Sequence, residues 1–134
     1  MSITSDIANK LADMTTLALP IYPMQYPDDV VNCVALIPGS GSQAQGKSSL
    51  FYTALGTLDY PSVRIQVRYT DPFNAFTIAE AIRIWLDANL PSGYLACRCT
   101  DPSAKDVTDE KSLAMSGGPA YIYEVEFSLT KVRA

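Results

Sequence analysis

The chain begins with an apolar stripe at helical spacing, formed by Ile3, Ile7, Leu11 and Met14. Residues three or four positions apart share one face of an α-helix, so the stripe predicts an amphipathic first helix. Ser2 or Thr4 can cap its start, and Pro20 lies beyond its end. The prolines that follow, up to Asp29, predict an extended connection with a short edge strand around Ile21.

Four later segments carry strand patterns. Apolar and polar residues alternate over Val63–Thr70, Tyr94–Cys99 and Tyr121–Thr130, as in strands with one buried face. In the first of these, Arg64, Gln66 and Arg68 lie opposite an apolar face. Asn32–Ile37 instead contains a continuous apolar run, which predicts a central strand that is covered on both faces.

The strand Val63–Thr70 leads directly into a predicted long helix. Asp71 is placed as N-cap and Pro72 as first helical residue, where the missing N–H costs nothing. The helix is expected to run to about Asn89 and to stop before Pro91. Its apolar face is predicted to comprise Phe73, Phe76, Ala79, Ile82, Leu86 and Leu90, with Ala75, Ile78 and Trp85 beside it.

The remaining segments are predicted as loops or stay ambiguous. Pro38–Ser49 is rich in glycine, serine and glutamine, and Asp101–Pro119 is polar with turn signals, so both are expected to be long surface loops. Leu50–Tyr60 fits a helix and a strand equally well. Together the patterns predict one α+β domain over residues 1–134: a mostly antiparallel sheet of about four to five strands, an N-terminal helix and one long helix packed on the sheet.

Composition narrows the class of protein. With 134 residues and 48% apolar content, the chain can build one core without disulfides or metals. The net charge is −4 and no basic run occurs, which argues against specific nucleic-acid binding. No apolar stretch is long enough to cross a membrane, and no secretory signal is evident, so synthesis in the cytosol is expected. Three cysteines are then expected to be reduced, with Cys97 and Cys99 in the core.

One short motif suggests nucleotide binding. Gly41–Ser48 matches the phosphate-loop pattern G-x-x-x-x-G-K-S, in which Lys47 would reach the phosphates. The fold of such proteins, however, needs several parallel strands joined by helices, whereas alternating strands favour an antiparallel sheet. A carboxylate that would hold magnesium at the end of a second buried strand is also missing. Nucleotide binding by this loop therefore stays as an alternative, and the preferred interpretation has no cofactor.

Other catalytic or metal chemistry is not indicated. The chain has no histidine, so it lacks Ser-His and Cys-His dyads. Cys33, Cys97 and Cys99 offer three sulfur ligands without a fourth, and burial as small apolar side chains explains them better. The sequence thus predicts a protein that is not an enzyme and binds no metal.

The run from Pro61 to Asp71, followed by Ala75, Ala79, Ile82 and Leu86, resembles the middle of tail-terminator and minor capsid proteins of long-tailed bacteriophages. In both, a strand that ends in an arginine leads into the helix covering the sheet. The order of elements across most of the chain is also similar. The resemblance implies a homo-oligomeric ring, expected to be hexameric, that caps the head-proximal end of the tail tube, ends its polymerisation and joins it to the neck. A head-side connector in the neck is the related alternative.

The resemblance implies a location in the virion, with assembly in the host cytoplasm, and partners in the tail-tube and neck proteins. Seven residues on the polar strand face and in the two long loops are expected to contribute to subunit and tube contacts: Arg64, Gln66, Arg68, Gly41, Lys47, Lys105 and Asp109. A ring needs two different patches on each subunit, which such a face and loops can provide.

Overall fold

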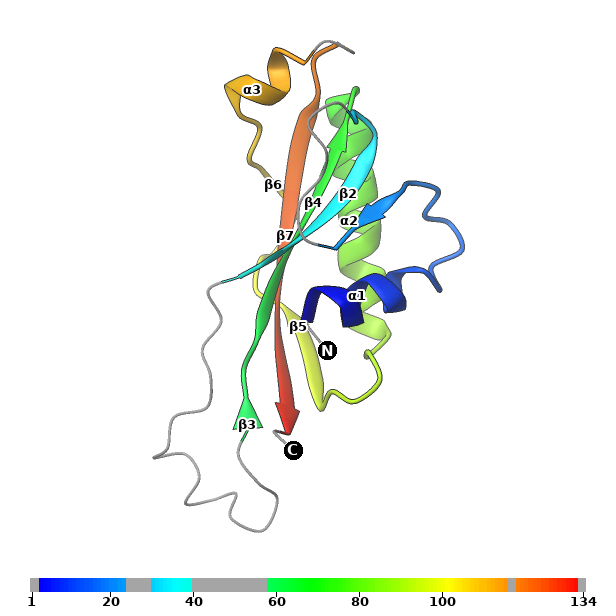
Figure 1. Ribbon diagram of the computed structural model, residues 1–134, viewed down its shortest axis with the longest axis vertical. Coiled ribbons are helices and arrows are strands. Elements are labelled where there is room, and N and C mark those ends of the chain that lie inside the picture. The colour runs from blue at the N-terminus through cyan, green and yellow to red at the C-terminus, as the bar shows by residue number, and fades with distance from the viewer. Residues whose placement is uncertain (1–2, 24–29, 40–57, 116–117, 133–134) are drawn as a thin grey trace.

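A computed structural model describes residues 3–23, 30–39, 58–115 and 118–132. Figure 1 shows their arrangement as a twisted sheet with helices packed against it. The elements are α1 (Ile3–Leu11), β1 (Ile21–Tyr22), β2 (Cys33–Pro38), β3 (Leu58–Asp59), β4 (Ser62–Tyr69), α2 (Pro72–Ala88), β5 (Ala96–Cys99), β6 (Lys105–Asp106), α3 (Glu110–Leu113) and β7 (Tyr121–Val132).

Strand β7 organises the sheet. Along one edge it pairs antiparallel with β4, from Ser62 opposite Ser128 to Tyr69 opposite Tyr121. The other edge of β7 pairs antiparallel with β5 and, further along, with β6. Beyond β4 lie β2, which is antiparallel to it, and then β1, which is parallel to β2. The short β3 pairs with the last residues of β7.

Helices α1 and α2 contribute to one hydrophobic core on a single face of the sheet. The alternation along β4 directs Val63, Ile65 and Val67 into this core, and each of them is fully buried. The core also contains Ile7 and Leu11 from α1, Val34 and Leu36 from β2, Ile82 and Leu86 from α2, and Val125, Phe127 and Leu129 from β7. Burial of this apolar surface is the main favourable contribution to folding. The opposite face of β4 and β7 is free to carry polar side chains.

The start of α2 confirms the predicted cap. The Asp71 Oδ1 atom accepts a hydrogen bond from the Phe73 N–H at 3.1 Å, Pro72 is the first helical residue, and Asn89 is the C-cap.

The buried face of α2 was predicted wrongly at its two ends. Phe73 is 73% exposed because it lies about 120° around the helix from Ala79, away from the sheet. Leu90 is exposed because it follows the C-cap and no longer shares the helical spacing.

The α+β class and the mainly antiparallel sheet are confirmed. Cys97 is in the core as predicted, and Cys99 packs half-buried against it. The segment Asp101–Pro119 is not a plain loop, because it contains β6 and the single-turn helix α3. These elements have two and four residues, which is too short to leave a periodic pattern in the sequence. The predicted Gly41–Ser48 loop lies outside the described residues, as do residues 50–57 of the ambiguous segment.

Candidate functional site

The polar face of the sheet lies on the side away from α1 and α2. It carries Arg64, Gln66 and Arg68 of β4, whose side chains alternate with the core residues of that strand. In the register of β4 with β7, Arg64 lies opposite Glu126 and Gln66 lies opposite Glu124. Lys105 of β6 lies opposite Glu124 on the other edge of β7. Three strands therefore bring charged side chains of both signs together.

Glu124 is the centre of this arrangement. Its Oε1 atom accepts a hydrogen bond from Gln66 Nε2 at 2.9 Å and lies 3.7 Å from Arg64 Nη1. Its Oε2 atom lies 3.9 Å from Lys105 Nζ. We call Arg64, Gln66, Lys105 and Glu124 the Glu124 cluster.

Exposure differs sharply within the Glu124 cluster. The Glu124 side chain is only 5% exposed, whereas those of Arg64 and Lys105 are 41% and 57% exposed. A buried carboxylate is tolerated because cations and an amide surround it. The two cations share Glu124, and the half-buried Glu126 lies opposite Arg64, so this face presents side chains of both charges to solvent. Arg64 and Lys105 are the exposed members of the Glu124 cluster that can contact another protein.

Arg68 lies on the same face but is not available for such a contact. It is 4% exposed, and its Nη1 atom donates a hydrogen bond to the Val30 carbonyl oxygen at 3.0 Å. Its guanidinium therefore ties β4 to the residue three positions before β2. The sequence placed Arg68 on the correct face, but alternation along a strand does not reveal what lies over that face.

Asp109 has a local structural role as the N-cap of α3. Its Oδ1 atom accepts a hydrogen bond from the Ser112 N–H at 2.8 Å. The hydrogen bonds with Ser112 lower the pKa of the Asp109 carboxyl, and the charge of Arg68 contributes further in the same direction. The other two expected contact residues, Gly41 and Lys47, lie outside the described residues.

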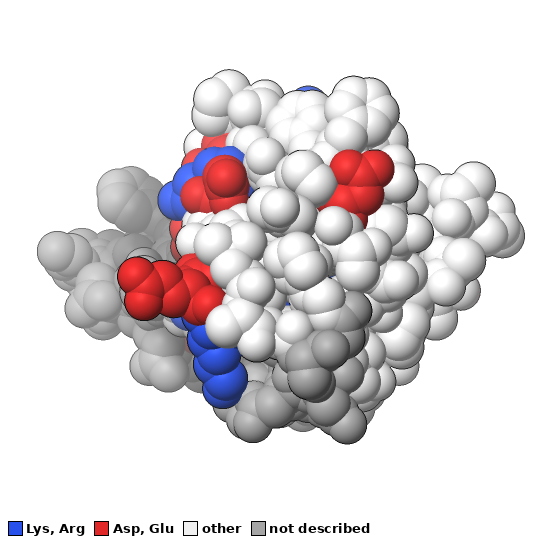
Figure 2. Space-filling model, turned by 90° about the horizontal axis from the view of Figure 1, so that it is seen from above, with Lys and Arg blue, Asp and Glu red and all other residues white. Residues whose placement is uncertain are grey.

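A second surface lies at the end of the molecule formed by α3 and the first turn of α2. Figure 2 shows that charged side chains gather toward one side of this end, while most of its visible surface is uncharged. Phe73 of α2 and Leu113 of α3, both in elements at this end, are exposed. We call this surface the α2–α3 end.

The cysteines show no sign of activation. Burial raises the pKa of the Cys33 thiol to about 11 and that of the Cys97 thiol to about 12. Within the described ranges, no group of three or more Cys, Asp and Glu side chains is placed to hold a metal ion. In the same ranges, no helix is long and apolar enough to span a membrane.

The strand before the glycine-rich segment also has the wrong partner for a phosphate-loop fold. Such folds place the following strand parallel to the first, through a helical crossover. Here β2 is antiparallel to β4, the next long strand of the described chain. The described strands therefore give no support to nucleotide binding.

Sequence reasoning identified Arg64, Gln66 and Lys105 but missed Glu124, which joins them. Alternation along Tyr121–Thr130 puts Glu124 on the polar face of the last strand, yet the sequence gives no register between strands. Gln66 and Glu124 are 58 positions apart, so only the fold brings them together.

The chain was also compared with known proteins. Neither a protein-family model nor a curated protein matches it.

Proposed function

We propose that this protein is a structural component of a phage virion, a ring that caps the head-proximal end of the tail tube. The resemblance of the segment from Pro61 to Leu86 supports the proposal, and so does the observed β4–α2 unit with Asp71 as its cap. The fold class agrees with the one that the resemblance implies. In this role the protein stops tube growth and offers a surface to the neck.

The Glu124 cluster is the observation that carries the proposal. In our proposal, Arg64 and Lys105 contact acidic side chains on the last ring of tube protein. Glu124, which accepts a hydrogen bond from Gln66, keeps these two cations close to it before contact, which reduces the entropy lost on binding. Electrostatic complementarity of this kind sets the orientation and the partner more than the raw affinity.

The α2–α3 end supplies a second contact surface. A ring between tube and neck needs two faces of different character, one for each neighbour. The charged sheet face and the charge-poor end with exposed Phe73 and Leu113 differ in this way. We assign the charged face to the tube and the α2–α3 end to the neck.

The net charge of −4 is compatible with a protein that lines the channel through which the DNA passes. A channel wall must let the phosphate backbone pass without binding it, and like charges repel. The cations of the Glu124 cluster are directed at a protein partner in this scheme, and they are partly neutralised by Glu124.

Capping of purified tail tubes tests the proposal. The double substitution Arg64→Gln and Lys105→Gln removes both half-exposed cations, and it should lower the fraction of tubes that carry a cap in electron micrographs. Lys10→Gln on α1 removes one positive charge elsewhere and should cap as the wild type does. Arg68 is left intact because it is buried, so its substitution would perturb folding. Equal capping by the double variant and the wild type would remove the Glu124 cluster from the contact.

A further inference from the structure

Helix α2 has an exposed face without charges on the side away from the sheet. Its inner face packs in the core through residues such as Ile82 and Leu86. Four exposed residues follow one another on the outer side at intervals of four, three and four positions: Thr77, Ala81, Ile84 and Ala88. We call them the α2 seam. A surface helix usually carries charged residues opposite its buried stripe, and the α2 seam departs from that pattern.

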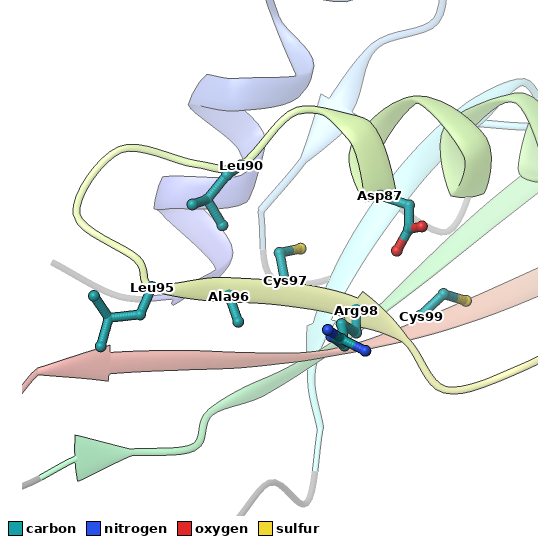
Figure 3. A pocket seen from close by; sticks show the side chains of 7 residues that line it. All are labelled: Asp87, Leu90, Leu95, Ala96, Cys97, Arg98 and Cys99. Atoms are coloured by element: carbon teal, nitrogen blue, oxygen red, sulfur yellow. The ribbon is translucent and has the colours of Figure 1, made fainter.

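The charged side chains of α2 lie to one side of the α2 seam. Arg83 pairs with Glu80, which also accepts a hydrogen bond from the Ala104 N–H. Asp87 points toward β5 and lines the groove between that strand and α2 (Figure 3). Helix α2 contains no other charged residue. A partner can therefore cover the α2 seam without taking an ionised group out of water, which keeps the cost of burial low.

The spacing of the α2 seam indicates the shape of its partner. Residues that recur at alternate intervals of three and four positions form the contact stripe of helices that pack side by side. Ala81 and Ala88 are small, so a second helix can approach closely at these positions. An extended strand would match a repeat of two positions instead. The occupant that fits this face is therefore an α-helix with an exposed stripe of its own.

Within the described residues, α2 is the helix that offers such a stripe. The apolar residues Ile7 and Leu11 of α1 are buried in the core of the same chain, and α3 has a single turn. We propose that the α2 seam receives α2 of a second copy, so that two chains form a two-fold dimer. A two-fold contact requires a surface that is complementary to itself.

Antiparallel pairing makes the α2 seam complementary to itself in size. When the two-fold axis passes between Ala81 and Ile84, each Ile84 lies on the Ala81 of the other copy. A side chain that is 62% exposed in the single chain then meets a small one. Ile78 and Trp85 are half-buried beside the α2 seam, on the side without charges. In the same arrangement, Ile78 of one copy faces Trp85 of the other.

A groove next to Ile78 offers space for this tryptophan. Its volume is about 260 Å³, and α2 and the segment after α1 contribute its apolar lining: Ile78, Ala81, Met14, Leu17 and Leu19. The indole ring of Trp85 from the second copy reaches the groove from the α2 side. Aromatic side chains contribute large apolar areas to protein contacts, so this insertion strengthens the pairing of the helices.

The size of the contact predicts its strength. A helix of 17 residues is about 26 Å long, and α2 with the groove beside it is about two helix diameters, or 20 Å, wide. Two such faces together bury about 1,000 Å², which is the lower limit for a specific interface. We therefore expect a weak dimer of the free chain. The Glu124 cluster stays uncovered, because it lies on the opposite side of the sheet.

Two substitutions place a positive charge in the α2 seam. Ile84→Lys and Ala81→Lys change exposed positions, so the single chain should still fold. Their matched controls are Leu95→Lys, just before β5, and Leu113→Lys in α3, which add the same charge at exposed leucines elsewhere.

Sedimentation velocity over a range of concentrations measures the self-association of the full chain, and circular dichroism checks folding. We expect the wild type and both controls to form dimers, and the two seam variants to associate at least about tenfold more weakly. Trp85 is the single tryptophan of the chain, so its fluorescence reports on the groove. Its emission should move to shorter wavelength as the wild type associates, and Ile84→Lys should abolish this change.

A wild-type chain that stays monomeric at the highest concentration reached would overturn the proposal and leave the α2 seam to a helix of another protein. Association that neither seam variant weakens would also overturn it. A dimer without the fluorescence change would contradict the antiparallel arrangement.

The dimer is independent of the proposed capping role, and the two can fail separately. Tail tubes that stay uncapped while the wild type dimerises through the α2 seam would contradict the role and leave the dimer intact. Capping by a chain that never dimerises would do the reverse.

Discussion

Gln66 and Glu124 lie directly opposite each other on β4 and β7, and their side chains share a hydrogen bond of 2.9 Å between Nε2 and Oε1. This cross-strand pair holds a carboxylate under the two half-exposed cations of the Glu124 cluster. The pair thus has two roles. It contributes to the stability of the sheet, and it fixes the charges that we propose to contact the tail tube.

The first prediction concerns the stability of this pair. Glu124→Ala removes the acceptor of Gln66 and the common partner of Arg64 and Lys105, so it should lower the free energy of unfolding by about 1–3 kcal/mol. Glu126→Ala, a neighbouring and half-buried carboxylate on the same strand, is the control and should change it by less. Urea denaturation followed by circular dichroism measures both. Equal losses would show that Glu124 has no special role.

Helix α2 offers a matched pair of isoleucines for the packing of the core. Ile82 is fully buried, whereas Ile84 on the other side of the helix is 62% exposed. Ile82→Ala should cost about 2–5 kcal/mol because it leaves a cavity. Ile84→Ala should change stability by less than about 0.5 kcal/mol. Thermal and urea unfolding of the two variants measure the difference, and similar costs would contradict the assignment of the buried face.

Glu80 predicts a pH dependence of stability. Its Oε2 atom pairs with Arg83 at 2.9 Å, and its Oε1 atom accepts a hydrogen bond from the Ala104 N–H at 2.6 Å. The hydrogen bond from Arg83 is the main cause that lowers the pKa of the Glu80 carboxyl from 4.5. A carboxyl whose pKa is lower in the folded chain stabilises the protein at pH values above its pKa in the unfolded chain. This stabilisation is lost as the pH falls through the lower pKa of the folded chain.

Between neutral and acidic pH, the wild type should therefore lose more stability than Glu80→Gln. Glu110→Gln, at an exposed position in α3, should follow the wild type. Unfolding free energies at several values of pH below 7 give the comparison. Parallel curves for Glu80→Gln and the wild type would contradict a stabilising role of the ionised carboxylate.

The buried thiols should react slowly in the native protein. Because burial raises the pKa of Cys97 to about 12, only about one molecule in ten thousand carries the thiolate at pH 8. Alkylation by iodoacetamide, mapped by mass spectrometry, should label Cys97 much faster in urea than under native conditions. Because the pKa of Cys97 is raised only in the folded protein, the free energy of unfolding also falls as the pH rises above 9, where the Cys97 thiol of the unfolded chain ionises. Equal labelling with and without urea would contradict the burial of Cys97.

The sequence was informative where structure depends on neighbours along the chain. Asp71 and Pro72 define the start of α2 by themselves, and alternation places Val63, Ile65 and Val67 on the buried face of β4. It was uninformative where structure depends on segments far apart. The partners of Glu124 come from two other strands, β4 and β6, and the burial of Arg68 depends on the carbonyl of Val30, 38 positions away.

The most direct test of the central claim uses tail tubes assembled from the tube protein of the same genome, imaged with and without this protein. We expect wild-type protein to form a ring at one end of each tube and to stop elongation from that end. The double variant Arg64→Gln and Lys105→Gln should leave most ends open. Tubes that continue to grow in the presence of folded wild-type protein, with no added density at either end, would contradict the account.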